Sequence, residues 1–537
     1  MQKVLTAEQM REVDRLTTKR YGIPSIILME NAAHAVVRVI TEKLGGSVEG
    51  KSILVLCGKG NNGGDGAAVA WKLALGGARV EIVLFGKVSE ARGDARINFD
   101  AAAHAVEWIR EVESREQWDK WFYQSWQGWE MVVDAVFGTG LSRPLDIWLG
   151  NVIRHINILN EGYHQPFRTT ISIDIPSGLN SDIGDAVGEC IQADATVTFT
   201  TPKPGNVLSP ASSFNGELVV ADIGSPDELV YEFTSSIFLA EHNDALDWLI
   251  DSDFSHNSYK NKRGHTLVIA GSDSYSGAAV LAGNAAMRSG VGLTTIATPR
   301  SSKDSIASRV LPEVMVRGVA ETGKGNIADD AYDELIDLLK KADSVAIGCG
   351  LAQEESTKRF VQKVVENRRQ PTVVDADALN LLSPFAAQRA NGESRYPLIL
   401  TPHEGEFMRL LGTDDKDAIK DRVSAVREFS QKHNVILVLK GERVLIGEPG
   451  GKVVVNPTGN SGLGKAGNGD TLTGILAGFT AQASAMDIDI FETVVAAVYV
   501  AGMAGDIAET KYGKRVMTAS DVRECLTDVF AELAVGQ

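Results

Sequence analysis

Short apolar runs with the composition of β-strands alternate with helical stretches along almost the whole chain of 537 residues. This alternation is typical of parallel sheets that carry helices on both faces. Each run is nearly continuously apolar, as expected for strands buried on both faces. The runs lie at residues 52–57, 80–85, 131–134, 171–174, 195–200 and 217–222, and then at 265–270, 292–298, 344–348, 372–376, 398–401 and 435–440. The sequence therefore predicts an α/β fold.

The strand pattern pauses around residues 226–240, and a connecting segment is expected up to Arg263. A chain of this length is several times the usual size of one domain. We therefore predict two α/β domains, over residues 1–230 and 240–537. The opening residues read as an amphipathic helix. In the second domain we also expect a hairpin and three late helices, at residues 443–447 with 452–455, and near 469–482, 487–507 and 518–533.

The charge balance excludes several classes of partner. Lys and Arg total 53 and Asp and Glu total 70, which gives a formal net charge of −17. This acidity discourages binding to nucleic acid or to an anionic membrane. No apolar stretch approaches the length that crosses a bilayer, and the four cysteines form no CxxC pair. The sequence therefore predicts a cytoplasmic protein without nucleic-acid or membrane partners.

A glycine-rich segment, Gly58–Gly66, follows the first strong strand and fits the pattern GxGxxG of dinucleotide-binding turns. Two features argue against that function. Asp65 inside the segment would repel a pyrophosphate, and the candidate ribose acid Glu81 lies early in its strand instead of at its end. A tight β–α turn would explain the glycines alone. Asn61, Asn62 and Asp65 together favour a loop that offers polar side chains to a ligand.

Two further carboxylates, Asp134 and Asp174, end predicted strands. Because ligands bind at the carboxyl ends of strands in open α/β sheets, both should face the same crevice as the glycine-rich segment. Asn62, Asp134 and Ser177 offer oxygen ligands that suit a hard, weakly held cation better than zinc. Gly138–Gly140 can present N–H groups to an anion, and Asp174 is free to exchange a proton with a substrate. For either aspartate alone, a helix cap or a turn remains the alternative.

The motifs NNGGDG, DAVFGTGL and DIPSGLN follow LT at 5–6, Asp14, GIP at 22–24 and LMENA at 28–32, and in this order they resemble the YjeF N-terminal domain over roughly residues 1–225. The resemblance implies a Rossmann-like, doubly wound sheet that epimerises R- and S-NAD(P)HX, the hydrated form of NAD(P)H. It implies a potassium ion at Asn62, Asp134 and Ser177. The implied substrate contacts are Asn61, Asn62, Gly63, Gly64, Asp65, Gly138, Thr139, Gly140, Leu141, Ser142, Arg143, Pro144 and Asp174. Lys59 and Ala33 depart from the usual Pro and Gly.

The second half contains one misleading and one informative glycine motif. Gly318–Lys324 fits the P-loop pattern GxxxxGK, but Gly325 follows where Ser or Thr should bind magnesium. With the next helix expected near Ala328, a surface turn is the better interpretation. Gly467–Asp470 (GNGD) opens a helix whose free N–H groups suit a phosphate, and Asp470 would be held ionised by the helix dipole and could accept a hydroxyl proton. A simple helix cap is the alternative for Asp470.

Further motifs accompany GNGD. His403 and Glu404 follow a strand end, and without a second His at HExxH spacing they give no support for zinc hydrolysis. A helix rich in Gly and Ala within residues 264–293 indicates close packing, and Lys440-Gly441 suggests a nucleotide contact. With SGAAVLAG, IGCGL, DADALN, TPHEGEF, LKG and NPTGN, the second half resembles the YjeF C-terminal, ribokinase-like family of nucleotide-dependent NAD(P)HX dehydratases, over about residues 240–535.

This second resemblance implies dehydration of S-NAD(P)HX with Mg²⁺ and ADP, although no residue decides between ADP and ATP. By motif, the substrate contacts are Ala279, Gly350, His403 and Asp470. The nucleotide contacts are Lys440, Gly441, Glu442, Arg443, Val444 and Gly469. Two departures stand out, because Cys349 replaces the usual Pro of GPG and KAGNGD, with Lys465, replaces TGGSGD.

Together the two halves predict the repair of NADHX and NADPHX by one bifunctional enzyme. Asp470 would assist attack of the substrate hydroxyl on the terminal phosphoryl group, and elimination would then restore NAD(P)H. A homo-oligomer is expected by analogy. The alternatives are a ribokinase-type small-molecule kinase with an N-terminal nucleotide-binding regulatory domain, or a first half that only binds partner proteins. An NAD-dependent dehydrogenase is the weakest of the alternatives.

Overall fold

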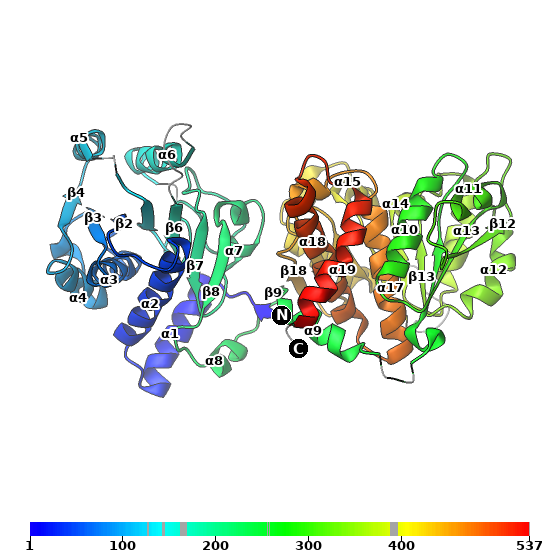
Figure 1. The fold of residues 1–537 in the computed structure, drawn as a ribbon, viewed down its shortest axis with the longest axis horizontal. Helices are drawn as coiled ribbons and strands as arrows, with labels where there is room; N and C mark the ends of the chain where they lie inside the picture. The colour runs from blue at the N-terminus through cyan, green and yellow to red at the C-terminus, as the bar shows by residue number, and fades with distance from the viewer. Residues whose placement is uncertain are drawn as a thin grey trace. The chain divides into compact units, whose positions relative to one another are not determined.

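The computed structural model describes residues 1–125, 128–141, 145–161, 169–254, 256, 258–386 and 396–535. The chain divides into two compact units, of which one comprises residues 3–235 and the other residues 1–2 with 236–537. Each unit is built on its own sheet (Figure 1). The predicted fold class, two α/β domains, is confirmed.

Within the described residues, the N-terminal unit has a seven-stranded parallel sheet in the order β4-β3-β2-β5-β6-β7-β8. Its strands are β2 (Ser52–Cys57), β3 (Arg79–Phe85), β4 (Trp108–Val112), β5 (Met131–Ala135), β6 (Thr169–Ile173), β7 (Ala195–Phe199) and β8 (Glu217–Ala221). The six predicted runs all form strands. The order reverses between β2 and β5, where an open α/β sheet forms its binding crevice.

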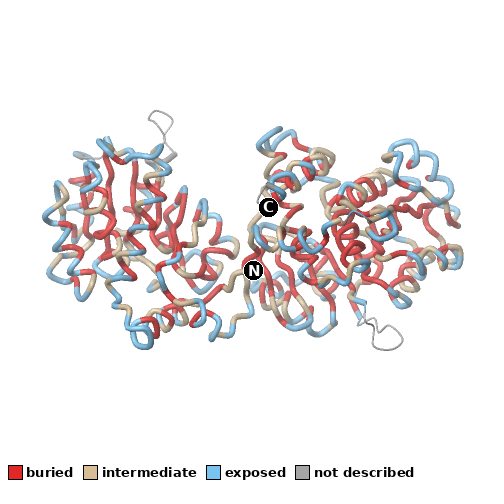
Figure 2. The backbone as a smooth tube through the Cα atoms, turned by 60° about the horizontal axis from the view of Figure 1, so that its bottom comes forward, coloured by how far each residue is buried: buried red, intermediate tan, exposed pale blue. Residues whose placement is uncertain are grey.

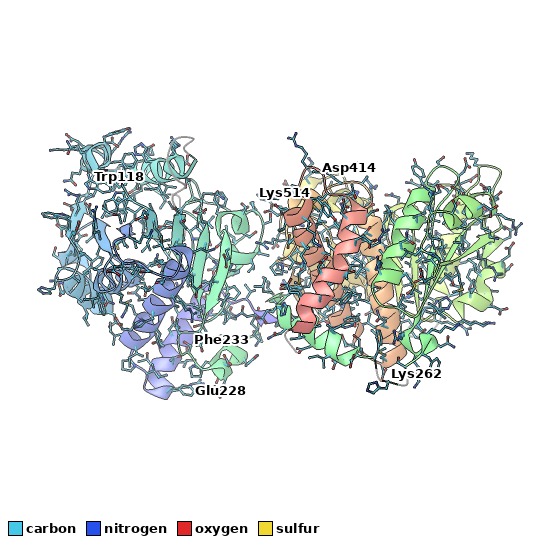
Figure 3. The ribbon with its side chains drawn as sticks, viewed as in Figure 1. Trp118, Glu228, Phe233, Lys262, Asp414 and Lys514 are labelled. Carbon is cyan, nitrogen blue, oxygen red and sulfur yellow. The ribbon has the colours of Figure 1, made fainter. Side chains whose placement is uncertain are left out.

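Helices cover both faces of this sheet because successive strand side chains point to opposite sides. Ile53 and Val55 pack with α2, α3 and α4, whereas Leu54 and Leu56 pack with α5 and α6. Trp118 of α5, labelled in Figure 3, is fully buried in this second cluster. The helices are α1 (Ala7–Tyr21), α2 (Ser25–Lys43), α3 (Asn61–Leu75), α4 (Gly93–Ala102), α5 (Arg115–Ser125), α6 (Ile147–Glu161), α7 (Pro204–Val207) and α8 (Asp227–Glu232).

The predicted N-terminal helix begins later than expected. Thr6 caps α1 by accepting a hydrogen bond from the Gln9 N–H, while the Gln9 side chain accepts one from Thr6 N–H. This capping box fixes the first helical residue at Ala7. Gln2 and Lys3 form the short strand β1 instead.

The sheet of the C-terminal unit has eleven strands in the part of the chain that the structure describes, in the order β1-β9-β18-β17-β16-β15-β14-β13-β10-β11-β12. The order reverses between β10 and β13, and the predicted hairpin is the antiparallel pair β17–β18. The strands are β9 (Ile237–Leu239), β10 (His265–Ile269), β11 (Leu293–Pro299), β12 (Met315–Val319), β13 (Ser344–Ile347), β14 (Thr372–Val374), β15 (Leu398–Leu400), β16 (Ile436–Leu439), β17 (Leu445–Gly447) and β18 (Val453–Val455).

Buried residues concentrate along the strands of each unit, and exposed residues lie mainly on the outer segments (Figure 2). In the C-terminal unit one large cluster joins alternate strand residues such as Val268 and Ile296 to α9, α10, α17, α18 and α19. The helices are α9 (His242–Asp251), α10 (Ser276–Arg288), α11 (Lys303–Ala307), α12 (Ala331–Leu339), α13 (Glu355–Glu366), α14 (Ala376–Leu381), α15 (Glu404–Leu411), α16 (Arg422–His433), α17 (Asn468–Met486), α18 (Ile490–Tyr512) and α19 (Ala519–Val535).

Three expectations about this unit are corrected. Residues 240–263 are more than a connection, because Trp248 of α9 stacks on Phe479 with ring centroids 3.9 Å apart. Gly318 lies in β12, so the misleading P-loop pattern begins inside a strand, and the following α12 starts at Ala331 and not near Ala328. α18 is apolar and long enough to cross a membrane by composition, but 67% of its most apolar window is buried. It serves as a core helix.

α10 and α17 pack backbone against backbone. A methyl group on Gly474 of α17 would lie 2.1 Å from the carbonyl oxygen of Ala282 and 2.9 Å from the Cβ of Ala285, both in α10. Contacts this short require glycine, which explains the small residues that the sequence shows in both helices.

We expect Gly474→Ala to lower the free energy of unfolding by about 1–3 kcal/mol, because the forced displacement outweighs the roughly 1 kcal/mol gain in helix propensity. Urea unfolding of the full chain measures it. Gly277→Ala is the matched control, since nothing lies within 4 Å of a methyl group added there in α10. That variant should be neutral or slightly stabilising. Equal stability of the two variants would contradict the close approach of the helices.

Candidate active sites

The turn after β2 lies at the reversal point of the N-terminal sheet and is pressed against its neighbours. A methyl group on Gly58 would lie 2.1 Å from the carbonyl oxygen of Val136, and one on Gly63 would lie 1.6 Å from that of Gly58. Glycine is therefore required for close approach here. The predicted loop residues Asn61–Asp65 form the first turn of α3 and not a loop.

Glu81, the candidate ribose acid of a dinucleotide site, has a structural role. It lies near the start of β3 and is 6% exposed. Its Oε1 accepts hydrogen bonds from the Trp121 Nε1–H at 3.0 Å and from Arg110 at 3.2 Å. These contacts tie β3 to β4 and α5, which agrees with the argument against a dinucleotide fingerprint.

Asp134, at the end of β5, is fully buried and binds its neighbouring strand ends. Its carboxylate accepts hydrogen bonds from the Ser177 Oγ at 2.6 Å, the Ser177 N–H at 2.8 Å and the Ser172 Oγ at 2.9 Å. The Ser177 Oγ in turn accepts the Phe137 N–H at 2.9 Å. Burial raises the pKa of Asp134 above its ordinary value, and the hydrogen bonds to its carboxylate offset this rise only in part. Among the ion pairs of the described residues, none involves Asp134.

Asn62 lies at the same strand ends and has an unusual environment. Both its side-chain oxygen and its nitrogen are buried without a hydrogen-bond partner. A Cβ on Gly138 would lie 3.2 Å from the Asn62 Cγ, which places the amide against the segment after β5. An unpartnered amide oxygen beside a buried carboxylate suits a hard cation. No cluster of three or more His, Cys, Asp or Glu that could hold a metal ion occurs in the described ranges.

Asp174 follows β6 with a φ of 67°, a strained value for a residue with a side chain. The Lys203 ammonium donates to the Asp174 Oδ1 at 2.8 Å, and the Thr198 Oγ donates to it at 3.1 Å. Lys203 also donates to Thr198 Oγ at 2.9 Å and to the carbonyl oxygen of Phe199 at 3.2 Å. Its side chain is only 3% exposed. Asp174 is therefore held by a buried lysine that sequence reasoning missed, although a lysine a few residues after an apolar strand was a visible signal.

The remaining predicted residues of this site lie around the same crevice. Burial raises the pKa of Asp65, and the charge of Asp174 raises it further. Gly138–Leu141 follow β5, and the carbonyl oxygen of Thr139 accepts a hydrogen bond from the Ser181 Oγ at 3.4 Å. Ser142, Arg143 and Pro144 lie outside the described residues.

The reversal point of the C-terminal sheet joins the loops after β10 and β13. The Gly271 N–H donates to the carbonyl oxygen of Cys349 at 2.9 Å. Gly350 has a φ of 65°, and a methyl group on it would lie 2.8 Å from the Cβ of Tyr275. The Ala279 side chain is fully buried in the core, whereas the Gly350 turn lies against Tyr275, just before α10.

An ion pair between the half-buried Lys440 and the buried Asp375 lies in this crevice. The Lys440 ammonium donates to the Asp375 Oδ1 at 2.7 Å and lies 3.8 Å from Glu406, while Thr473 of α17 donates to the Asp375 Oδ2 at 2.8 Å. Burial opposes the charge of Lys440, but Asp375 and Glu406 outweigh burial and raise its pKa. A Cβ on Gly469 would lie 3.5 Å from the Lys440 Nζ, which brings GNGD to this pair. Asp375, part of the DADALN motif, had been given no role.

Asp470 lies in the first turn of α17, behind the left-handed N-cap Gly467. Burial raises the pKa of Asp470, and a hydrogen bond with the Cys349 thiol lowers it. We expected the helix dipole to keep this carboxyl ionised, and the burial that opposes ionisation was not visible in the sequence. Burial and the charge of Asp470 raise the pKa of Cys349, so the thiol stays protonated and can donate. Cys349, which stands where the family usually has Pro, thus forms a hydrogen bond with the proposed reactive carboxyl of Asp470.

His403 caps α15 at the end of β15. Its Nδ1 accepts the N–H groups of Gly405 at 3.0 Å and Glu406 at 3.3 Å, and the Glu406 carboxylate accepts the His403 N–H at 2.9 Å. A parallel bridge pairs His403 with Lys440. The structure therefore brings His403, Lys440, Gly469 and Asp470 to one group of strand ends, with the His403 side chain 56% exposed.

The predicted nucleotide segment, Gly441–Val444, is the turn from β16 to β17. Arg443 donates to the carbonyl oxygen of Pro457, and Arg422 Nη1 donates to that of Glu442 at 3.0 Å. The Arg422 Nη2 is buried without a partner among the described atoms, next to Gly441. Sequence reasoning missed Arg422, which adds a positive charge beside this turn.

Comparison with known proteins adds independent findings. A family model described as YjeF-related protein N-terminus matches residues 25–205, and one described as NAD(P)H-hydrate dehydratase matches residues 266–528. The bifunctional NAD(P)H-hydrate repair enzyme Nnr of Moorella thermoacetica is 37% identical and covers 99% of this chain and 97% of its own. That of Thermofilum pendens is 34% identical and covers 96% and 94%.

A solved structure, an ADP/ATP-dependent NAD(P)H-hydrate dehydratase from Bacillus subtilis co-crystallised with ATP/Mg²⁺, is 31% identical. It covers 56% of this chain and 100% of that chain, with a TM-score of 0.48. The relatives match over nearly their full length, and both resemblances seen in the motifs are confirmed. The chain belongs to the family of bifunctional NAD(P)H-hydrate repair enzymes.

Proposed function

We propose that this chain repairs hydrated NAD(P)H in two steps. The N-terminal unit interconverts R- and S-NAD(P)HX, and the C-terminal unit dehydrates the S form to NAD(P)H at the expense of ADP. One observation carries the proposal: the chain has full-length relatives named bifunctional NAD(P)H-hydrate repair enzymes, and in each unit a candidate reactive carboxyl lies near the strand ends where the sheet order reverses. These carboxyls are Asp174 and Asp470.

In the N-terminal unit, Asp174 exchanges a proton with the substrate at the hydrated ring carbon. Lys203 and Thr198 hold its Oδ1, which leaves the other oxygen for the substrate and fixes its direction. Asn61–Asp65 and Gly138–Pro144 form the binding walls. Because α3 begins at Asn61, its first N–H groups are also available to the phosphates of the nucleotide.

In the C-terminal unit the difficulty is that hydroxide is a poor leaving group. Asp470 accepts the proton of the substrate hydroxyl as that oxygen attacks the terminal phosphoryl group of the nucleotide, and elimination of the phosphate then restores the double bond. Gly467–Gly469 offer N–H groups to the developing charge. The nucleotide is bound by Lys440 and the Gly441–Val444 turn, together with Arg422, while Lys440 keeps its hydrogen bond to Asp375. Gly350 and His403 border the substrate, and Ala279 supports it from below.

Magnesium suits this site because it is usually held through substrate phosphates and a few carboxylates. When bound, it neutralises phosphate charge. The ribokinase-type alternative differs in outcome, because a kinase would release a phosphorylated product and not NAD(P)H.

The donor set of the N-terminal site fits potassium. Asp134 is a buried carboxylate outside every ion pair of the described residues, and Asn62 has an unpartnered amide oxygen. Ser177 completes the group. When bound, the ion would balance the charge of Asp134 and hold the substrate-binding segment after β5 in place.

The remaining assignments follow from charge and kinship. The net charge of −17 and the buried position of α18 support a cytoplasmic enzyme without nucleic-acid or membrane partners. We also propose a homo-oligomer, by analogy with related proteins.

An R/S mixture of NADHX with magnesium, potassium and ADP or ATP should be converted completely to NADH, as followed by dihydronicotinamide absorbance. Asp174→Asn should convert only the S epimer quickly to NADH, because proton exchange at the epimerase site is lost. Asp470→Asn should stop conversion while the epimers still interconvert. Each variant is the control for the other. A phosphorylated product in place of NADH would establish the kinase alternative.

Replacing potassium with tetramethylammonium should lower the thermal midpoint of the N-terminal unit and its rate of epimerisation, with S-NADHX dehydration unchanged. Asn62→Leu should abolish this dependence on potassium, because it removes the unpartnered amide. Differential scanning calorimetry in the two salts gives a readout that needs no activity. Identical midpoints of the unmodified chain in both salts would contradict the cation site.

Cys349→Ala should move the acid limb of the dehydratase pH profile to higher pH, by about 0.4–1 unit, since a hydrogen bond contributes about 0.5–1.5 kcal/mol and one pKa unit equals 1.36 kcal/mol. Loss of the thiol raises the pKa of Asp470, which must be ionised to accept a proton. Cys525→Ala, at another buried cysteine, is the control. An unchanged limb would show that the thiol does not act on Asp470.

A further inference from the structure

The first helix of the N-terminal unit reaches the crevice although no motif assigned it a role there. Before α1, the Leu5 N–H donates to the carbonyl oxygen of Pro202 at 3.1 Å, and within it Met10 accepts a hydrogen bond from the Thr201 Oγ at 3.4 Å. Both contacts are with the segment that carries Lys203. Asp14 is four residues after Met10 and therefore lies on the same helix face.

The carboxyl of Asp14 has no structural task in the described molecule. Its Oδ1 is buried without a hydrogen-bond partner, which costs about 1–3 kcal/mol in a folded protein. Two residues earlier, Glu12 pairs with Arg15 on the exposed side of the same helix. A fold does not require a buried carboxyl oxygen without a hydrogen-bond partner, so a contribution to a ligand explains the Asp14 Oδ1 better than packing does.

The charges that face Asp14 are those of the epimerase crevice. Burial raises the pKa of Asp14 to about 6, with Lys203 lowering it and Asp174 raising it. The charges of Asp174 and Asp14 both raise the pKa of Asp65. Lys203, Asp174 and Asp65 are thus the groups that surround it. Asp14 can therefore both give and take a proton near neutral pH.

The reaction requires two proton transfers. The hydrated carbon carries the hydroxyl and is bonded to the ring nitrogen. When the hydroxyl oxygen gains a proton, the carbon–oxygen bond breaks, water leaves with the electron pair, and the nitrogen lone pair forms a carbon–nitrogen double bond. Water then adds to the opposite face and gives up one proton. Atoms and charges balance if one group supplies a proton and another accepts one.

We propose that Asp14 is the second proton carrier of the epimerase site and works as the partner of Asp174. This inference rests on the proposed epimerase function. Asp14 protonates the departing hydroxyl while Asp174 takes the proton of the incoming water, and the two roles are exchanged when the opposite epimer reacts. Lys203 donates a hydrogen bond to Asp174, and its charge also acts on Asp14.

The test uses the full chain, with R-NADHX as substrate for epimerisation and S-NADHX as substrate for dehydration. Asp14→Asn should reduce kcat of epimerisation by a factor on the order of 100 or more, with little change in KM and no change in dehydration. Glu12→Gln, which removes a carboxylate from the exposed side of α1, is the matched control and should keep normal activity. Epimerisation by Asp14→Asn within threefold of the unmodified chain would overturn the proposal.

A pH profile separates catalysis from structure. Epimerisation by the unmodified chain should fall above about pH 6, and this limb should be absent in Asp14→Asn. Asp14→Glu retains a carboxyl and should epimerise at least tenfold faster than Asp14→Asn. Equal losses in the Asn and Glu variants with an unchanged profile would make Asp14 structural and overturn the proposal. Failure of the unmodified chain to interconvert the epimers would instead remove the proposed function itself.

Discussion

In each unit a carboxylate at the end of a parallel strand is held by a lysine that is largely shielded from solvent. Asp174 pairs with Lys203, and Asp375 pairs with Lys440. Removing such charges from water costs several kcal/mol per ion, which a pair recovers only with good geometry and with its remaining donors and acceptors satisfied. Lys203 meets this condition with three acceptors, and Thr473 supplies the second donor to Asp375. The arrangement of each crevice depends on these pairs, because either partner alone would be an uncompensated buried charge.

The carboxyl groups near these two ion pairs lie in different environments. Burial raises the pKa of Asp14, Asp65 and Asp470, so these groups hold protons more readily than a surface carboxyl does. Groups of one chemical type that sit in different environments can serve as acid and as base in one site. In the N-terminal unit the difference comes from Lys203, and in the C-terminal unit it comes from the Cys349 thiol beside Asp470.

The sequence predicted the central strands well because strands buried on both faces are continuously apolar. It did not predict β4 and β12, which lie at sheet edges and carry exposed polar residues such as Arg110 and Arg317. Asp134 and Asp174 were found because topology alone brings strand ends together. Lys203, Asp375 and Arg422 were missed because their importance depends on burial and on partners far away in the chain. The burial that raises the pKa of Asp470 was hidden for the same reason.

Each unit has its own sheet and its own hydrophobic core. The two proposed reactions nevertheless depend on each other, because one forms the epimer that the other consumes. A dehydratase that accepts one epimer leaves the other behind unless interconversion keeps pace. Joining both units in one chain fixes the ratio of the two kinds of active site at one to one, whatever the level of expression. Repair of the whole pool therefore requires that interconversion of the epimers keeps pace with dehydration.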